Sequence, residues 1–116
     1  MTARGGPRSR IIGDVTIYPI GEGTSLGRFV QAAFRAMAGV RGLRLVPTAM
    51  STTFEAPDLP TAFRAVGRAH AALVRMGAKR IAILVRVDHR LDKLETMEYK
   101  IRRVTAGPRG RRRIAR

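Results

Sequence analysis

Two stretches of the chain, residues 11–20 and 79–88, alternate between apolar and polar side chains. Alternation places successive side chains on opposite faces of an extended strand, so each stretch predicts a β-strand with one apolar face. Two shorter apolar stretches, residues 43–49 and 51–56, predict two further strands. The chain is therefore expected to build its core on a β-sheet.

Between these strands the apolar residues recur at the three- and four-residue spacing of amphipathic helices. Residues 24–38 predict one helix, for which Thr24 or Ser25 is a suitable N-cap. Residues 60–76 predict a second helix, with His70 in its apolar stripe. A lone histidine in such a stripe is more often a hydrogen-bonded core residue than a ligand or a base.

A third, strongly charged helix is predicted over residues 92–104, with Asp92 favouring its start electrostatically. The order of the other elements is strand, helix, strand, strand, helix, strand. This βαββαβ pattern is that of the ferredoxin-like fold, an α+β sandwich with both helices on one face of an antiparallel sheet. We expect one such domain at residues 11–104, between a basic arm at residues 1–10 and a basic, disordered tail at residues 105–116.

The chain of 116 residues has a net charge of +15, and nine of its 23 basic residues lie before residue 11 or after residue 102. Cysteine is absent, which excludes disulfides, thiolate nucleophiles and cysteine-held metals. No apolar run approaches the ~20 residues needed to span a bilayer. The basic N-terminus lacks the apolar region of a secretory signal, so a cytoplasmic location and no membrane partner are expected.

One face of the predicted sheet has no helix over it. That face is expected to show Asp14, Thr16 and Tyr18 from the first strand, and Leu84, Arg86 and Asp88 from the last. A mixed face of this kind is wet, a floor for a ligand, or an interface between copies of the chain. Asp14 and Arg86 are also explained by an ordinary cross-strand ion pair. We expect the uncovered face to make the protein at least a dimer.

The densest group of charged side chains follows the last predicted strand. It contains Asp88, Arg90, Asp92, Lys93 and Glu98. We interpret it as a hydrogen-bonded cluster that anchors the C-terminal helix, partly at a subunit contact; the alternative is a solvated ion-pair network. No metal site, cofactor site or catalytic set is readable, because both histidines stand apart from further ligands and no base is placed beside a particular serine.

Four features of the chain are similar to those of the small thiamine-binding protein family. They are Tyr-Pro-Ile-Gly at residues 18–21, Met-Ser-Thr-Thr-Phe-Glu at residues 50–55, His70, and the charged run over residues 88–100. The resemblance spans about residues 11–104. It implies a ferredoxin-like fold, assembly through the open sheet face into dimers and often tetramers, and binding without catalysis.

The resemblance implies that the ligand is thiamine or its hydroxymethylpyrimidine moiety. An aminopyrimidine ring needs hydroxyl or carboxylate partners and an apolar or aromatic surface. The candidates are Thr16, Tyr18, Thr52 and Glu55, with Asp88 to balance the thiazolium cation. The alternative function is a nucleic-acid-associated protein that uses its arginine-rich ends, since ferredoxin-like sheets also bind single-stranded RNA.

Overall fold

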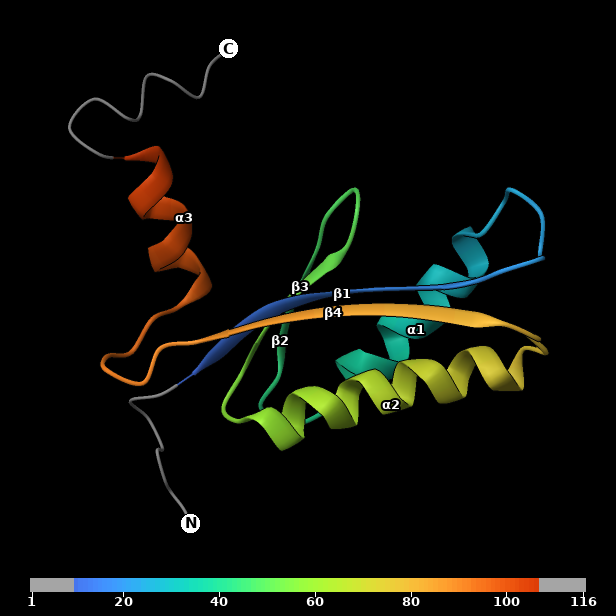
Figure 1. Ribbon diagram of the computed structural model, residues 1–116, viewed down its shortest axis with the longest axis horizontal. Coiled ribbons are helices and arrows are strands. Elements are labelled where there is room, and N and C mark those ends of the chain that lie inside the picture. Colours follow the sequence, from blue (N-terminus) through green and yellow to red (C-terminus); the bar gives the residue numbers. More distant parts are fainter. Residues whose placement is uncertain (1–9, 107–116) are drawn as a thin grey trace.

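The computed structural model describes residues 10–106, so the sequence-based predictions for residues 1–9 and 107–116 lie outside the described part. The elements are β1 (Ile11–Pro19), α1 (Gly27–Ala38), β2 (Arg44–Pro47), β3 (Thr52–Ala56), α2 (Leu59–Arg75), β4 (Ile81–His89) and α3 (Met97–Thr105). The four strands form one antiparallel sheet in the order β2-β3-β1-β4. Figure 1 shows α1 and α2 on one side of this sheet and α3 beyond its end. The ferredoxin-like α+β fold is confirmed.

The core lies between β1 and the two helices. Ile11, Val15 and Ile17 alternate along β1 with residues that face the other way, and all three are buried. Phe29 of α1 and Leu73 of α2 are among the largest fully buried side chains. The predicted alternation of the first strand is therefore correct, and it sets which side chains of β1 remain on the open face.

Gly13 is required in β1 by the close approach of its neighbours. A Cβ atom at this position would lie 2.1 Å from the backbone oxygen of Arg86 and 2.7 Å from the ring of Phe54. Both distances are shorter than van der Waals contact, and the Arg86 contact involves backbone that cannot rotate away. The missing side chain thus lets Phe54 of β3 pack closely against the central strand.

The buried stripe of α2 differs from the predicted one. The helix buries Ala62, Ala65, Ala69 and Leu73, whereas His70 is exposed. The placement of His70 in the apolar stripe was wrong. The physical reason is that small alanine side chains allow the helix to pack closely against β1, β3 and α1, which turns the larger side chains outward.

Two helices begin later than predicted. Leu26 is the N-cap of α1 and no side chain caps that end, so neither Thr24 nor Ser25 has the predicted role. The third helix begins at Met97 rather than at residue 92, because the Thr96 hydroxyl accepts a hydrogen bond from the Tyr99 amide and starts the helix there. Asp92 lies in the preceding loop.

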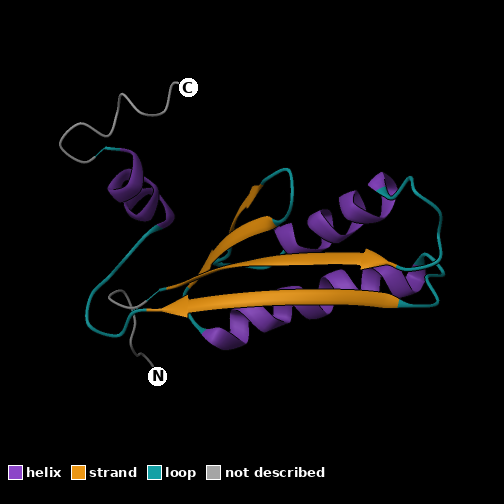
Figure 2. Cartoon of the chain, turned by 45° about the horizontal axis from the view of Figure 1, so that its top comes forward, coloured by secondary structure: helices purple, strands orange, loops and turns teal. Residues whose placement is uncertain are grey.

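β4 has the predicted alternation, but it is an edge strand and much of it is exposed. Leu84 points to the open face and is 59% exposed, and Val87, on the helix side, is still 40% exposed. The helices α1 and α2 contact mainly β1 and β3. Figure 2 shows β4 beside β1 as one of the two long strands, at the edge of the sheet. β4 therefore offers apolar side chains on both of its faces.

Candidate functional site

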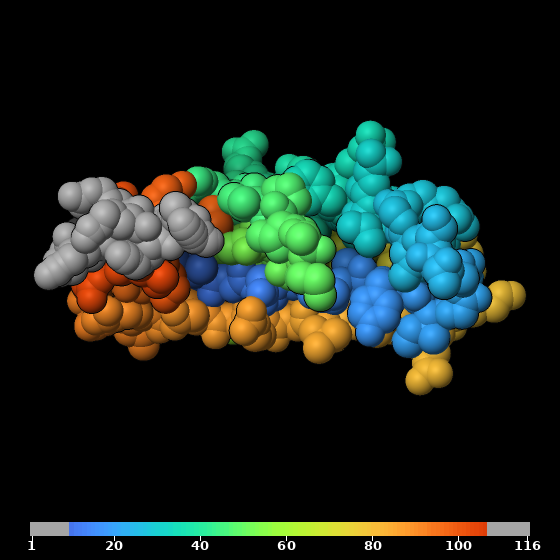
Figure 3. Space-filling model, turned by 90° about the horizontal axis from the view of Figure 1, so that it is seen from above, coloured from blue at the N-terminus to red at the C-terminus, as the bar shows by residue number. Residues whose placement is uncertain are grey.

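The central strand loses one of its two neighbours halfway along its length. Pairing between β1 and β3 ends at Val15 and Thr52, whereas pairing between β1 and β4 continues to Pro19. One edge of β1 is therefore free over residues 16–19. The turn at residues 48–51 stands beside this free edge, and in Figure 3 that green turn and the β1–α1 connection both rise toward the viewer.

A hollow of about 390 Å³ lies between the free edge of β1, the helix α1 and the β2–β3 turn. We call it the edge hollow. Its apolar wall includes Val30, Phe34, Met37 and Met50. Five hydroxyl-bearing residues also line it, Thr16, Tyr18, Thr48, Ser51 and Thr52, and none of its lining residues is charged.

The turn beside the edge hollow is held by its own hydrogen bonds. The Thr48 hydroxyl donates to the Ser51 carbonyl oxygen at 2.8 Å and accepts from the Ser51 amide at 3.0 Å. Thr16 of β1 donates to the Met50 carbonyl oxygen at 3.3 Å, which ties the turn to the strand. The Ser51 hydroxyl also donates to the Asp14 carboxylate at 3.4 Å. Neutral hydrogen bonds therefore preorganise most of the wall of the hollow, and one longer bond joins it to a charged group.

The structure brings three of the five predicted ligand-binding residues together. Thr16, Tyr18 and Thr52 all line the edge hollow. The sequence did not point to α1 as part of the site, because Val30 and Phe34 fit the apolar spacing of an ordinary core-facing helix. Val30 is instead 49% exposed and faces the hollow. The sequence did hold one signal for this contribution: the apolar stripe of α1 is wider than the sheet can cover.

Glu55 lies away from the edge hollow, at the junction between the sheet and α3. Its side chain is 3% exposed and accepts a hydrogen bond from the Met97 amide at 2.9 Å. It also pairs with Arg10 at 2.8 Å and with Arg44 at 3.3 Å. This carboxylate therefore fixes the start of α3 against the sheet.

Arg44 connects this junction to the first turn of α3 through Glu98. Its hydrogen bonds lower the pKa of the Glu98 carboxyl group to about 2. Glu98, which was assigned to the charged cluster after β4, therefore joins the Glu55 junction. The two acids lie on either side of one guanidinium group.

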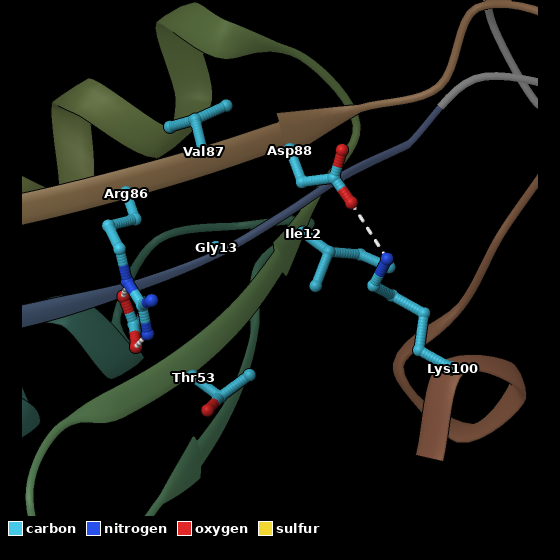
Figure 4. A pocket seen from close by; sticks show the side chains of 8 residues that line it. Ile12, Gly13, Thr53, Arg86, Val87, Asp88 and Lys100 are labelled. Atoms are coloured by element: carbon cyan, nitrogen blue, oxygen red, sulfur yellow. Dashed lines mark hydrogen bonds and ion pairs between the residues drawn. The ribbon is translucent and has the colours of Figure 1, made fainter. Parts of the chain in front are cut away.

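Asp88 lies on the open face of the sheet, within a shallow hollow of about 420 Å³ (Figure 4). It accepts a hydrogen bond from the Lys100 ammonium group of α3 at 2.7 Å, and this bond lowers its pKa. In the same hollow Arg86 pairs with Asp14 at 2.6 Å. The interpretation of Asp14 and Arg86 as a cross-strand ion pair is confirmed.

The loop between β4 and α3 contains the rest of the predicted cluster. Arg90 binds Asp92 and also reaches Glu95 at 3.5 Å. Glu95, which the sequence analysis did not single out, is nearly buried and pairs with Lys100 as well. Lys93 contacts the Tyr99 hydroxyl instead of an acid. The predicted cluster is therefore divided into three groups around α3: Asp88, Arg90 and Asp92 belong to one network, Glu98 to the Glu55 junction, and Lys93 to Tyr99.

Comparison with known proteins identifies the family. A family model described as thiamine-binding protein matches residues 13–105. The chain belongs to this family. The match spans both the edge hollow and the charged groups around α3, so both regions lie within the part of the chain that the family shares.

Several relatives in the family carry no assigned activity in their names. The UPF0045 protein sll0230 of Synechocystis is 34% identical over 94 residues, which are 81% of this chain and 76% of that protein. The UPF0045 protein YqgV of Bacillus subtilis is 34% identical over 97 residues, which are 80% of this chain and 92% of that protein. The crystal structure of the hypothetical protein MJ1052 from Methanocaldococcus jannaschii superimposes with a TM-score of 0.76 at 27% identity, over 82% of this chain and 95% of that one.

Within residues 10–106 no helix is long and apolar enough to cross a bilayer. In the same part of the chain, histidine and acidic side chains do not gather in groups of three or more that would hold a metal ion. The residues that line the edge hollow are apolar or carry a hydroxyl group, apart from the amide-bearing Gln31.

Proposed function

We propose that this protein binds thiamine or its hydroxymethylpyrimidine moiety without transforming it, and that the pyrimidine ring occupies the edge hollow. The observation that carries the proposal is the hollow itself. Its volume of about 390 Å³ falls within the range of small-molecule sites, and its walls combine apolar side chains with hydroxyl groups. Membership in the thiamine-binding protein family supports the same class of ligand.

The free edge of β1 gives a reason for placing the ring there. Thr16 and Tyr18 stand on the stretch of β1 that β3 leaves unpaired, and Thr52 is the last residue of β3 to pair with it. The hydroxyls of these three residues supply donors and acceptors for the amino and ring nitrogens of a pyrimidine. Phe34 and Met50 supply apolar surface for the ring faces.

The charge of the hollow favours the pyrimidine moiety over intact thiamine. The thiazolium ring of thiamine is a cation, and burying a cation without a counter-charge is costly. The edge hollow contributes no carboxylate to such a ring, and both Glu55 and Asp88 are paired elsewhere. We therefore expect the neutral hydroxymethylpyrimidine to bind more tightly than thiamine.

Calorimetric titration with hydroxymethylpyrimidine and with thiamine tests this proposal. Tyr18→Phe and Thr52→Val each remove one hydroxyl at nearly constant shape. We expect each to weaken binding by roughly fivefold, the value of one neutral hydrogen bond of about 1 kcal/mol.

The chain offers a matched control for each variant. Tyr99→Phe makes the same change on α3, and Thr53→Val makes it one residue along β3, outside the hollow. Both controls should bind like the wild type. If the wild type gives no heat of binding up to millimolar ligand, or if the controls lose as much affinity as Tyr18→Phe, the hollow is not the site.

We also propose that copies of the chain associate through the open sheet face. Leu84 is 59% exposed there, directly opposite Thr16 on β1, and Tyr18 is the next residue of β1 on that face. Covering this surface would remove apolar area from water. Leu84→Asp should therefore shift the mass measured by light scattering toward the monomer.

Leu91→Asp is the control for this shift, because Leu91 is even more exposed but lies in the loop after β4. It should leave the measured mass unchanged. A wild type that is monomeric at micromolar concentration contradicts the proposed assembly.

A further inference from the structure

The hydroxyl oxygen of Tyr99 on α3 accepts hydrogen bonds from two cations. The Lys93 ammonium nitrogen lies 3.1 Å from the hydroxyl oxygen and 4.7 Å from the ring centroid. Arg103, one helical turn along, donates to the same oxygen at 3.2 Å. Figure 1 shows α3 at the opposite end of the sheet from the β1–α1 connection, so this group is separate from the edge hollow.

The neighbouring cations form ion pairs with acidic side chains, whereas Lys93 acts on Asp92 only through longer-range electrostatics. Arg90 binds Asp92, and Lys100 binds Asp88 and Glu95. Among residues 10–106, no carboxylate lies within ion-pair distance of Lys93 or Arg103. The phenol oxygen accepts from both cations, and its own hydrogen has no acceptor in the described part of the chain.

Three kinds of donor therefore converge, and each keeps hydrogen-bonding capacity that the described residues do not use. The ammonium group of Lys93 and the guanidinium group of Arg103 both have N–H groups left over after bonding Tyr99. The hollow that these residues line has a volume of about 300 Å³. Arg90, Lys100 and Glu95 also line it, so its positive charges outnumber its negative ones.

We propose that Lys93, Tyr99 and Arg103 form a binding site for the phosphate group of a small phosphorylated molecule. A phosphate offers several acceptor oxygens with negative charge, which the three donors lack. Arginine and lysine bind phosphate through charge-assisted hydrogen bonds, which are about twice as strong as neutral ones. The tyrosine ring beside the site gives a flat surface for the rest of the molecule.

The concave shape favours a small phosphate ester over a nucleic acid. A polymer contacts an extended row of cations, whereas these donors meet around one oxygen atom. The open sheet face, on which RNA-binding sheets stack bases, has one aromatic residue among the described residues, Tyr18. The donor geometry therefore points to a single phosphate group.

Titration of the full-length protein with inorganic phosphate, in a buffer free of other oxyanions and at physiological salt, tests the site. We expect saturable binding, weakened about tenfold by Lys93→Met or Arg103→Met, because each removes a charge-assisted hydrogen bond. Arg75→Met, which removes an exposed arginine from the last turn of α2, is the matched control and should bind like the wild type. Equal loss in all three variants, or no saturation at millimolar phosphate, would overturn the proposal.

A spectroscopic measurement tests the same contact directly. Lys93 and Arg103 lower the pKa of Tyr99 through their hydrogen bonds. Bound phosphate should engage both cations and move the ionisation of Tyr99, followed by tyrosinate absorbance, to higher pH. In Tyr99→Phe this shift should vanish, because Tyr18 is then the one tyrosine left.

A competition experiment with a short single-stranded oligonucleotide tests the nucleic-acid alternative. Under the proposal, inorganic phosphate displaces any oligonucleotide that binds at Lys93 and Arg103. If the oligonucleotide binds through these residues and phosphate does not displace it, the cluster is a nucleic-acid surface and the proposed small-molecule site is wrong. Because the site is separate from the edge hollow, this result leaves the proposed pyrimidine binding untouched.

Discussion

The edge hollow and the surroundings of α3 are held together by different chemistry. The hollow has no charged lining residue, and its turn depends mainly on neutral hydrogen bonds from Thr16 and Thr48, with one longer bond from Ser51 to the Asp14 carboxylate. The surroundings of α3 depend on ion pairs, the most buried of which are those of Glu55. Neutral contacts respond little to pH and salt, whereas ion pairs respond to both. The two regions are thus suited to different ligands and should fail under different conditions.

The largest expected effect comes from Glu55, which joins α3 to the sheet. Glu55→Gln leaves Arg10 and Arg44 without their shared carboxylate, and breaking a buried pair from one side costs about 3 kcal/mol. The free energy of unfolding in urea should fall by about that amount, and the amides of α3 should lose hydrogen-exchange protection.

Glu98→Gln is the matched control for Glu55→Gln, since Glu98 binds the same arginine from an exposed position. It should change the unfolding free energy much less. Equal losses in the two variants would mean that burial at the Glu55 junction does not matter, and the contrast between the two regions would weaken.

An acid titration should separate the two regions next. Arg44 holds the pKa of Glu98 at about 2, below its ordinary 4.5, and Lys100 lowers the pKa of Asp88. A lowered folded-state pKa gives stability that is present above the ordinary value and is lost as the pH falls toward the folded one. Attachment of α3 should therefore weaken as the pH falls from 4.5 toward 2.

Amide exchange followed by NMR across this pH range gives the comparison. The amides of α1, whose contacts with the edge hollow contain no acid, should keep their protection until the whole domain unfolds. Loss of protection in α1 and α3 at one common pH would show that the two regions unfold as a unit.

The smallest effect is expected for the ion pair on the open face. Arg86 is highly exposed and pairs with Asp14 in water, where such pairs contribute little. Arg86→Ala should leave the urea midpoint almost unchanged and should not alter pyrimidine binding. A large loss of stability would show that this pair is covered, and an accompanying loss of the dimer mass would place it at the interface between copies.

The sequence alone determined the fold and the alternation within its strands. Side chains of β1 alternate strictly, so the period of two fixed which of them face the helices and which face outward. The order of strands and helices along the chain is compatible with few topologies, and the ferredoxin-like topology was correct. The family resemblance rested on short runs of neighbouring residues, which the linear sequence preserves.

The tertiary structure decided which polar residues meet. Thr16, Tyr18 and Thr52 meet because β3 ends early and leaves β1 with a free edge, and this length mismatch has no local sequence signal. Glu55 lies apart from them because it pairs with Ile12, near the other end of β1, where it reaches the start of α3.

The helix faces were decided in the same way. His70 of α2 and Val30 of α1 fit an apolar stripe by spacing, yet both are exposed. A helical period leaves the rotation of the helix about its axis uncertain by about one residue, and packing against the sheet fixes that rotation. Spacing along the chain therefore determines the elements, whereas contacts between elements determine the sites.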